Sequence, residues 1–545
     1  MIMKSNDSRA NEAQLKAINS DDSKILCLAG AGTGKTFTLI ERIGRLVSDG
    51  YCQGDNILAL TFTNAAAFEM RERYARKFAQ SNSKLPEFRT FHAFCYSLLS
   101  KDVAIRSRMG YSAPTPPQIC DDAQMKEIIK GVKLKCNIKL SDAKLQNPDL
   151  LSHNDKYMYD LYMKALKCEL GRRNVITFDM LCYEICKLFE DDDPIIQHYK
   201  SKYHYIFVDE FQDTDPKQWQ FVKSFTHSHL FIVGDALQAL YGFRNADSSI
   251  IKGLSNNPDW TVIKLYQNYR STKQICDFAN QMSTYAESTY RIEIESDREG
   301  SSVCQAVTCD SSRFKPVSSE QLWAILDDVE KLTGSTAILC RQNDEKTEII
   351  NYLESVDVPV TSSKLYEEAT HMFESAKDNN YLVSWLATYL NESAYLDWLR
   401  IVALHDCPDD VAKFRLFKEI TANHKIISDN IKKITQIRSI MKSPCASEDK
   451  QCQIFKLLKV RKSKIKQGLN NNTEIADYIS EVLGSSIEAD IYVGTIHSAK
   501  GLEYDNVILV GVGGSRFTLN TDEQLNCYYV GITRAKKWLK IYWAQ

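Results

Sequence analysis

The sequence lacks the segments that would take a protein into or across a membrane. No uninterrupted apolar run reaches the roughly 20 residues that a bilayer crossing needs, and Met1–Asp7 contains no apolar secretory core. No Cys-x-x-Cys pair occurs among the 16 cysteines, which argues against zinc and iron–sulfur sites. Cys27, Cys340 and Cys527 lie in apolar runs. We therefore expect a cytoplasmic protein with reduced core thiols and no membrane partner.

An excess of basic residues is also missing. The chain has 68 Lys and Arg against 70 Asp and Glu, a formal net charge of −2. Proteins that coat duplex DNA are usually basic, so any nucleic acid would bind in a local channel rather than over the whole surface. There is no solenoid repeat and no low-complexity tail. A length of 545 residues suggests three to five domains.

Short apolar runs alternate with helical patterns along most of the chain. Each run is continuously apolar, as a strand buried on both faces should be. The clearest runs are Lys24–Ala29, Ile57–Thr61, Tyr205–Val208, Leu230–Val233, Val262–Leu265, Ala337–Cys340, Ile491–Gly494 and Val507–Val510. Residues of about 93–183 and 376–488 are mainly helical instead. This layout predicts an α/β protein with two parallel-sheet cores, each carrying a helical insertion.

A phosphate-binding loop follows the first of these runs. Its residues are Ala29, Gly30, Ala31, Gly32, Thr33, Gly34, Lys35 and Thr36. The glycines permit close approach of a phosphate, and the following helix presents free N–H groups. Lys35 should reach the β- and γ-phosphates, and the Thr36 hydroxyl should coordinate Mg²⁺.

Carboxylates that complete such a site follow the run Tyr205–Val208. Asp209 would hold Mg²⁺ through water, and Glu210 would polarise the attacking water. Adjacent carboxylates in a loop are often only solvated charges, but here they follow an apolar strand in a chain that already has a phosphate loop. On these residues alone the prediction is an Mg²⁺-dependent NTPase.

An ordered series of further motifs resembles the UvrD/Rep-like branch of the superfamily 1 helicases. The matching segments run from near the N-terminus to the end of the chain: Asn11–Leu15, Thr61–Ala67, Thr90–Phe94, Thr177–Leu181, Val208–Thr214, Val233–Arg244, Gln267–Ser271, Thr495–Glu503 and Tyr529–Ala535. A P-loop kinase or GTPase would leave the last three unexplained. The resemblance is therefore more specific than any one motif.

The resemblance implies two RecA-like P-loop cores, each with a mainly helical insertion. Core 1A would comprise residues 1–92 and 184–272, with insertion 1B at 93–183. Core 2A would comprise residues 273–375 and 489–545, with a reduced insertion 2B at 376–488. ATP would bind between the cores.

The same resemblance assigns roles around the nucleotide. Gln14 would read adenine, Tyr269 would stack on it, and Glu503 would contact the nucleotide. Gln238 would sense the γ-phosphate. Arg270 and Arg534 would be arginine fingers from the second core, where a fixed guanidinium couples hydrolysis to closure.

The resemblance also implies a track for single-stranded DNA. The residues at family DNA-contact positions are Phe62, Asn64, His92, Tyr241, Phe243 and His497. The three aromatic rings would stack on bases, which is a sequence-tolerant grip worth about 1–3 kcal/mol per base. Asn64 and the two histidines would contact the backbone or base edges.

The DNA-facing motifs depart from the family more than the ATP site does. The family usually has Lys at the position of Ala65 and acidic residues at the positions of Ala236 and Leu237. The second insertion is short, and no nuclease constellation follows the last motif. Such a compact motor resembles accessory helicases, one group of which is the helicase subunit of the Gabija antiphage system, whose partner is an ATPase–nuclease of the overcoming-lysogenisation-defect type.

Two hypotheses of different class follow from the sequence. The first is an ATP-dependent helicase or translocase that moves 3′ to 5′ on single-stranded or partly duplex DNA, in repair or antiphage defence; the polarity comes from the resemblance. The second is a DNA-sensing regulatory ATPase that controls a partner nuclease without processive unwinding.

Overall fold

The computed structural model separates into two compact units. It describes residues 10–78, 84–120, 122–141, 144–145, 151–240, 248–286, 290–308, 317–356, 358, 360, 436–437, 439–441, 446–458, 474–475 and 491–544. Unit 1 comprises Met1–Tyr266 and Glu287–Ile292, and unit 2 comprises Gln267–Ala286 and Glu293–Gln545. Most of the second predicted insertion, 376–488, lies outside the described residues.

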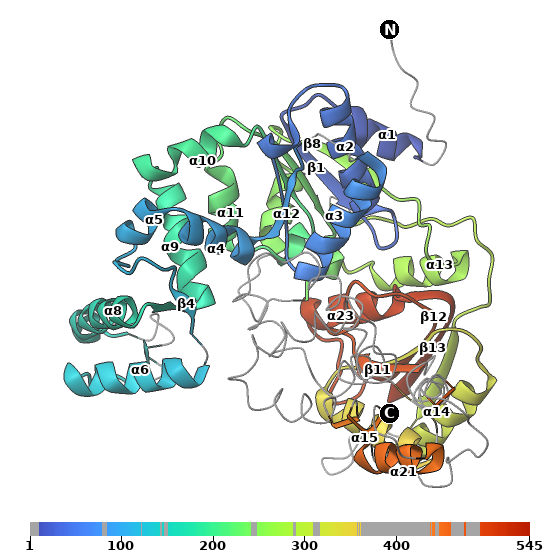
Figure 1. The fold of residues 1–545 in the computed structure, drawn as a ribbon. Helices are drawn as coiled ribbons and strands as arrows, with labels where there is room; N and C mark the ends of the chain where they lie inside the picture. Colours follow the sequence, from blue (N-terminus) through green and yellow to red (C-terminus); the bar gives the residue numbers. More distant parts are fainter. Residues whose placement is uncertain are drawn as a thin grey trace. The chain divides into compact units, whose positions relative to one another are not determined.

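A six-stranded parallel sheet is the centre of unit 1 (Figure 1). Its strand order is β3-β2-β6-β7-β1-β8. The strands are β1 (Lys24–Ala29), β2 (Ile57–Thr61), β3 (Glu87–Thr90), β6 (Tyr205–Val208), β7 (His229–Gly234) and β8 (Thr261–Leu265). Since all six are parallel, their carboxyl ends lie at one edge of the sheet, where the predicted site residues follow.

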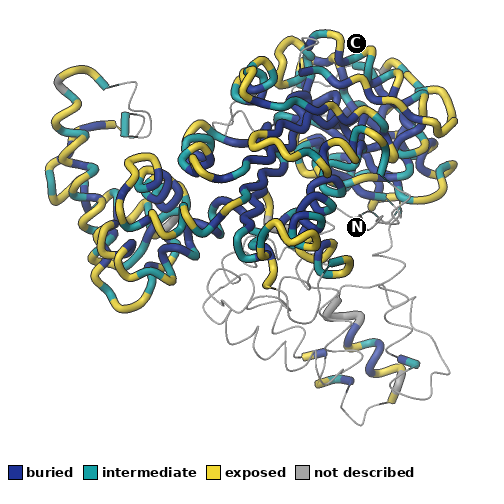
Figure 2. Tube along the Cα trace, turned by 90° about the horizontal axis from the view of Figure 1, so that it is seen from above, coloured by how far each residue is buried: buried dark blue, intermediate teal, exposed yellow. Residues whose placement is uncertain are grey.

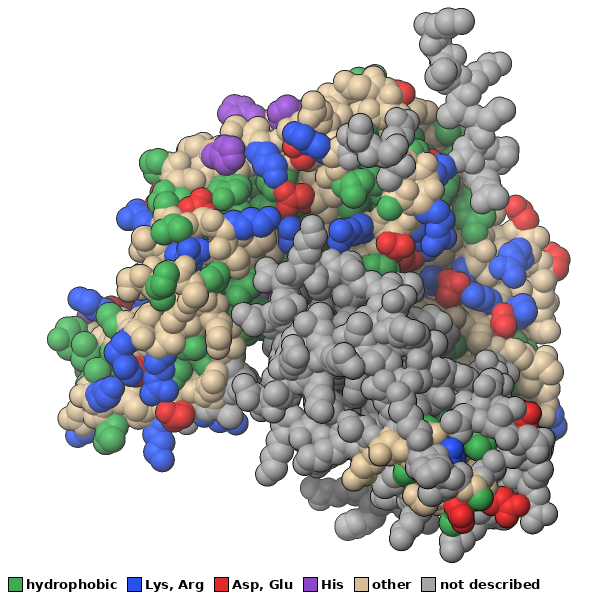
Figure 3. Space-filling model, viewed as in Figure 1, with side chains coloured by type: hydrophobic (Ala, Val, Ile, Leu, Met, Phe, Trp, Pro, Cys, Tyr) green, Lys and Arg blue, Asp and Glu red, His purple; other side chains and the backbone are tan. Residues whose placement is uncertain are grey.

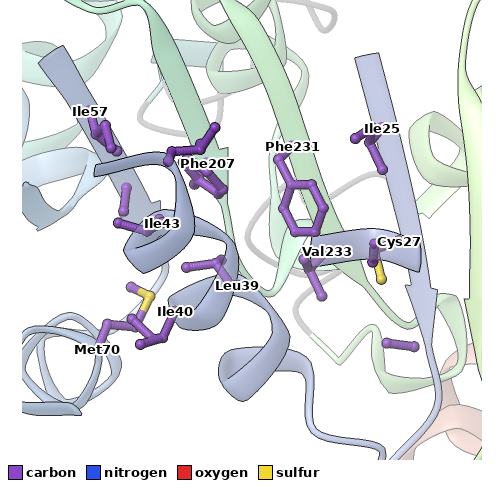
Figure 4. Packing of buried hydrophobic residues seen from close by; sticks show 14 of the residues in the cluster. Ile25, Cys27, Leu39, Ile40, Ile43, Ile57, Met70, Phe207, Phe231 and Val233 are labelled. Atoms are coloured by element: carbon purple, nitrogen blue, oxygen red, sulfur yellow. The ribbon is translucent and has the colours of Figure 1, made fainter. Parts of the chain in front are cut away.

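Helices cover this sheet and bury a continuous apolar core. Around the sheet lie α1 (Glu12–Asn19), α2 (Lys35–Ser48), α3 (Asn64–Phe78), α11 (Pro216–Lys223) and α12 (Ser248–Ser255). Leu39, Ile40 and Ile43 of α2 pack toward Phe207 and Phe231 of the central strands (Figure 4). Figure 2 shows the buried residues along the trace in dark blue, next to intermediate and exposed ones.

The first insertion is a helical subdomain with its own core. Its helices are α4 (Phe91–Lys101), α5 (Val103–Arg108), α6 (Asp122–Lys135), α8 (His153–Arg173), α9 (Phe178–Glu190) and, after it, α10 (Gln197–Lys202). Two short strands, β4 (Gln118–Ile119) and β5 (Val175–Ile176), pair in parallel. Ile128, Val132, Leu166 and Leu170 are among the buried residues that join α6 to α8.

A second parallel sheet organises unit 2. Its order is β11-β10-β12-β13-β9, from β9 (Cys304–Thr308), β10 (Thr336–Cys340), β11 (Ile491–Thr495), β12 (Tyr504–Val512) and β13 (Ala535–Ala544). The helices with it are α13 (Lys273–Met282), α14 (Ser319–Lys331), α15 (Asn343–Ser355), α21 (Ser447–Leu458) and α23 (Asp522–Ile532). The prediction of an α/β fold with parallel sheets is therefore confirmed.

All eight apolar runs singled out in the sequence form strands, but three strands of the two large sheets were missed, as were the short strands β4 and β5. Strands β3 and β9 lie at sheet edges and are only partly apolar. Lysines interrupt the apolar pattern of β13. Their ammonium groups pair with acidic side chains: Lys536 with Glu503 at 2.7 Å, and Lys540 with Asp328 at 2.6 Å. A pattern based on continuous apolar runs cannot find a strand of this kind.

The first unit ends six residues before the boundary drawn at 272. The backbone N–H of Asn268 donates to the carbonyl oxygen of Glu295 at 2.6 Å, and Ser271 Oγ donates to the carbonyl oxygen of Ala535 at 2.6 Å. These bonds place Gln267–Ser271 in the second unit, whereas the predicted range 184–272 assigned the segment to the first core. Contacts made far along the chain decide this boundary.

Charge is dispersed over the surface. On the face shown in Figure 3, outside the grey atoms, acidic and basic side chains are interspersed. This agrees with the formal net charge of −2. In the part of the chain that the structure describes, no helix is long and apolar enough to cross a membrane.

Arg42 of α2 holds the C-terminal end of α1 in place. The side chain is 2% exposed, and its Nη1 donates to the carbonyl oxygens of Ala17 at 2.8 Å and Ser20 at 2.7 Å. The guanidinium also lies 5.1 Å from the ring centroid of Phe231. Since a cation favours the carbonyl end of a helix, Arg42 fixes α1 against the sheet.

Replacing Arg42 by Ala should loosen α1 and β1. The change leaves buried carbonyls unpaired, so we expect a loss of about 2–4 kcal/mol in local stability. Hydrogen exchange of β1 peptides, measured by mass spectrometry, would then accelerate at least about 30-fold. The control is Lys77→Ala, which removes a surface ion pair with Glu41 and should cost at most about 1 kcal/mol. Equal exchange in the two variants would contradict this role.

Candidate functional site

The phosphate loop has the backbone conformation that its sequence predicted. Gly32 and Gly34 have φ of 69° and 81°, the left-handed region that favours glycine. Gly34 is the N-cap of α2, and as a glycine it has no side chain to bond the first N–H groups of that helix. Lys35 and Thr36 form its first turn. The loop therefore presents backbone donors and a positive helix end at the carboxyl edge of the sheet.

Gln14 is buried beside this loop. Its Nε2 donates to the carbonyl oxygen of Thr33 at 3.0 Å, and its Oε1 accepts from the N–H of Asn11 at 3.0 Å in a capping box. A Cβ on Gly34 would lie 2.8 Å from Nε2, so only glycine fits there without displacing Gln14. Each end of an amide has capacity for one further bond. The side chain thus supports the loop and retains the groups that could bind a base.

Two carboxylates face the loop from the end of β6. Asp209 Oδ2 accepts from Thr36 Oγ1 at 3.4 Å, and Lys35 Nζ lies 3.9 Å from Glu210 Oε1. Asp209 is 3% exposed. Burial, together with the charge of Glu210, raises the pKa of Asp209 to about 7, and Lys35 opposes this shift. Glu210 has φ of 50°, a left-handed conformation uncommon for a residue with a side chain.

Hydrogen bonds connect Glu210 to the γ-phosphate sensor predicted at Gln238. Gln212 Nε2 donates to Glu210 Oε2 at 2.5 Å, and Gln212 Oε1 accepts from the N–H of Asp235 at 3.0 Å. Asp235 Oδ2 then accepts from Gln238 Nε2 at 2.7 Å. Burial raises the pKa of Asp235, and Lys35 opposes the rise. Glu210 and Gln238 therefore belong to one buried polar network.

Sequence reasoning missed the two middle members of this network. Gln212 and Asp235 lie inside motifs that the sequence did identify, but each had been given no role. Gly234 bears on this contact, but only the structure shows how. A Cβ at that position would lie 2.9 Å from Gln212 Oε1, which explains why a glycine precedes Asp235.

The pair Thr36 and Asp209 fits an Mg²⁺ ion. Both side chains offer an oxygen ligand, and Thr36 Oγ1 lies 3.4 Å from Asp209 Oδ2. Asp209 is buried next to Lys35. Magnesium prefers oxygen ligands and is usually held by one or two protein groups plus substrate phosphates and water. The predicted Mg²⁺ site is thus compatible with the donors present.

Both predicted arginine fingers are bonded within unit 2. Arg270 Nε donates to Glu503 Oε2 at 2.8 Å, and Lys536 contacts the other oxygen of Glu503 at 2.7 Å. Arg534 is 1% exposed, and its Nε donates to the carbonyl oxygen of Val530 at 3.0 Å. Tyr269 is 47% exposed, as a residue that stacks on a ligand requires.

The predicted DNA contacts are only partly described. Thr61 and Thr90 pair in register, so Phe62 and His92 leave neighbouring strands at the same edge of the first sheet. Both side chains are half-buried. His497 is half-buried in the turn after β11.

Three of the predicted DNA contacts have no described side chain. Asn64 begins α3, but its side chain lies outside the described residues. Tyr241 and Phe243 also lie outside them. Their predicted contacts with bases therefore stay predictions.

Comparison with known protein families identifies two domain models that match the chain. The model of the UvrD/REP helicase N-terminal domain matches residues 10–259. The model of the UvrD-like helicase C-terminal domain matches residues 263–411 and 404–545. The site residues of unit 1 fall in the first match, and Arg270, Glu503 and Arg534 fall in the second.

Similar curated proteins carry helicase names. The chain is 34% identical over 294 residues to the ATP-dependent DNA helicase PcrA of Bacillus subtilis (strain 168), covering 50% of this chain and 39% of that protein. It is 32% identical over 302 residues to a probable DNA helicase II homolog of Mycoplasma capricolum, covering 50% and 40% respectively. The matches thus span about two fifths of each relative's length. Because the two domain models together extend from residue 10 to residue 545, the chain belongs to the UvrD/Rep-like family of superfamily 1 helicases.

Proposed function

We propose that this protein is an ATP-dependent DNA helicase or translocase that moves 3′ to 5′ on single strands. The observation that carries the proposal is the buried constellation of Lys35, Thr36, Asp209 and Glu210 at one sheet edge, in a chain of the UvrD-like family. The polarity rests on the family resemblance. ATP and Mg²⁺ are the proposed ligands, and the cytoplasm is the proposed location.

In this mechanism each residue of unit 1 has one task. Lys35 neutralises the β- and γ-phosphates, and Thr36 and Asp209 hold the metal, which supplies charge neutralisation for the phosphates. Glu210 orients and polarises the attacking water. Gln238 senses the γ-phosphate, and its bond to Asp235 passes that state through Gln212 to Glu210. Gln14 binds the adenine edge.

Arg270 and Arg534 of the second unit are the proposed arginine fingers. Each must first exchange a partner, Glu503 for Arg270 and backbone carbonyls for Arg534. Because a guanidinium pairs more strongly with a phosphate when water is excluded, this exchange favours the nucleotide-bound state. Tyr269 and Glu503 are the further proposed contacts of the nucleotide. The proposed DNA contacts are Phe62, Tyr241 and Phe243, which stack on bases, with Asn64, His92 and His497, and they convert ATP turnover into steps along DNA.

A second candidate is a DNA-sensing ATPase that regulates a partner nuclease. Ala236 and Leu237, where the family usually has acidic residues, are both 2% exposed and pack in the core. Their apolar character removes charges beside Gln238, so nucleotide state could be reported without unwinding. Under either candidate, repair and antiphage defence are the proposed settings, and an overcoming-lysogenisation-defect nuclease is the proposed partner. The four-part 1A/1B/2A/2B division remains part of the same proposal.

Replacing Lys35 by Ala tests the ATP site directly. We expect the ATPase rate stimulated by single-stranded DNA to fall at least about 100-fold, because the phosphate charge loses its counter-charge. The measurement is phosphate release with and without oligonucleotide, and Lys16→Ala on the exposed face of α1 is the control. Wild-type turnover in the Lys35 variant would overturn the proposal, as would wild-type ATPase activity that single-stranded DNA never stimulates. Strand separation is then measured on duplexes with a 3′ or a 5′ single-stranded tail. Separation distinguishes a helicase from a DNA-sensing ATPase, and the tail that supports it gives the polarity.

Replacing Gln212 by Leu tests the network between Glu210 and Gln238. The variant keeps the volume but breaks both bonds, so we expect kcat to fall about 10–100-fold with little change in the dissociation constant of ATP. Stopped-flow phosphate release and equilibrium binding of a fluorescent ATP analogue measure the two quantities. The matched control is Gln220→Leu, at a half-exposed position of α11. Loss of binding without loss of kcat would contradict the network's role.

The raised pKa of Asp209 predicts a pH-dependent metal affinity. A carboxyl group with a pKa of about 7 must lose its proton before it binds Mg²⁺. Between pH 8 and pH 6 the apparent Mg²⁺ affinity of the ADP complex should therefore weaken about tenfold. Calorimetric titration of Mg²⁺ measures this, and Asp209→Asn should retain only the smaller dependence due to ADP itself. An identical pH dependence in wild type and variant would argue against Asp209 as a ligand.

A further inference from the structure

A segment that belongs to none of the helicase motifs runs beside the loop Asn268–Thr272, which leads from β8 to α13 and is neither helix nor strand. This segment, Ile294–Gly300, is called the supporting segment below. Gln267 and Glu295 form an isolated parallel bridge, and the N–H of Asn268 donates to the carbonyl oxygen of Glu295 at 2.6 Å. The supporting segment therefore lies directly against the loop, and both belong to the second unit.

Side chains of the supporting segment bond three consecutive carbonyl groups of the loop. Arg298 Nη1 donates to the carbonyl oxygen of Arg270 at 2.6 Å and to that of Tyr269 at 3.3 Å. Ser296 Oγ donates to the carbonyl oxygen of Ser271 at 2.7 Å. Because a loop without regular structure does not satisfy its own carbonyl groups, these side chains supply donors that the loop lacks.

The N–H groups of the loop are bonded as well. Asn268 is 2% exposed, and its Oδ1 accepts from the N–H of Arg270 at 2.8 Å and from that of Ser271 at 2.7 Å. The N–H of Lys273, at the start of α13, donates to the carbonyl oxygen of Arg298 at 2.7 Å. Arg298 therefore bonds this stretch of chain through both its backbone and its side chain.

Close packing at Gly300 keeps the supporting segment beside the loop. A Cβ at this position would lie 2.4 Å from Thr272 Cγ2, so any larger residue would require the segment or Thr272 to shift. The N–H of Gly300 donates to Gln274 Oε1 at 2.9 Å, and Gln274 Nε2 donates to Glu299 Oε2 at 2.7 Å. The supporting segment is thus fixed near both of its ends, at Glu295 and at Gly300, with Arg298 between them.

We propose that Arg298 is a positioning residue for ATP hydrolysis. By holding the carbonyl groups of Tyr269 and Arg270, it fixes the directions in which these two side chains leave the loop. The Tyr269 ring is 47% exposed, so its orientation depends on the backbone that carries it more than on packing. This inference rests on the proposed function, in which Tyr269 stacks on adenine and Arg270 is an arginine finger.

The chemistry of the guanidinium predicts which replacements of Arg298 are tolerated. A hydrogen bond from a charged donor is stronger than one between neutral groups. Both bonds to the loop come from one nitrogen, Nη1. A lysine ammonium also has three donors on one nitrogen, whereas alanine has none. Arg298→Lys should therefore keep part of the positioning that Arg298→Ala loses. Because Arg298 is exposed, neither change should prevent folding.

Kinetics of the DNA-stimulated ATPase test the proposal on the full chain with saturating oligothymidylate. Arg298→Ala should lower kcat about tenfold, because the finger is less often in place, and should raise KM for ATP about threefold, because stacking on adenine weakens. Arg298→Lys should return kcat to within about threefold of wild type. The control is Lys331→Ala, an exposed cation of α14 that pairs with Asp327, and it should leave both constants unchanged.

A double-mutant cycle separates positioning from a general loss of stability. Since Arg298 affects kcat through Arg270, adding Arg298→Ala to an Arg270→Ala protein should lower kcat by at most about twofold further. The rise in KM should persist in that background, because it acts through Tyr269, and should disappear in a Tyr269→Ala background. A role in stability alone would instead reduce the folded fraction, leave KM unchanged and multiply the two losses in kcat.

The outcomes that overturn the proposal differ from those that overturn the proposed function. Wild-type kcat and KM in Arg298→Ala, or losses in kcat that multiply in the double variant, would refute the positioning role. If Arg270→Ala lowers kcat in the same assay, the proposed function survives that result. Wild-type kcat in Arg270→Ala would instead show that Arg270 is no finger, and the proposal for Arg298 would fall with it.

Discussion

The structure depends on one constraint, the burial of several carboxylates around a single lysine at the carboxyl edge of a parallel sheet. Asp209 and Asp235 are 3% and 2% exposed, and burial is the largest cause of the raised pKa of each. The charge of Lys35 lowers the pKa of both acids. One ammonium group, however, cannot compensate two buried acids and Glu210 as well. A divalent cation and the phosphates that it accompanies would balance these charges. The burial of these acids therefore has an electrostatic cost that a bound cation would offset.

Hydrogen bonds from uncharged amides keep this site in order. Gln212 and Gln238 bond with the carboxylates of Glu210 and Asp235, and Gln14 bonds the phosphate loop. Amides contribute donors without adding charge, so they fix the acids in place without neutralising them. This accounts for the similar acid-and-glutamine sequences, Asp209–Gln212 and Asp235–Gln238, that follow the neighbouring strands β6 and β7. The network makes the position of Glu210 sensitive to whatever contacts Gln238.

The sequence predicted the parts of the fold and site that short motifs encode. Glycines at 32 and 34 and the run before them defined the phosphate loop, because its conformation is local. Relations between distant residues could not be predicted in this way. The bond between Thr36 and Asp209 joins positions 173 residues apart, and the pairing of Lys536 with Glu503 hid the strand β13. Such contacts depend on strand order and register, which continuous apolar runs do not specify.

Ionisation states show the same limit at the chemical level. Scattered cysteines in apolar surroundings indicated inert core thiols, and for Cys27 that interpretation agrees with its complete burial and raised pKa. The raised pKa of Asp209 could not be inferred from the sequence, because it depends on burial at the end of β6 and on the charge of Glu210, and Lys35, far away in the chain, opposes it. A residue's ionisation state is thus set by the groups that the fold packs around it.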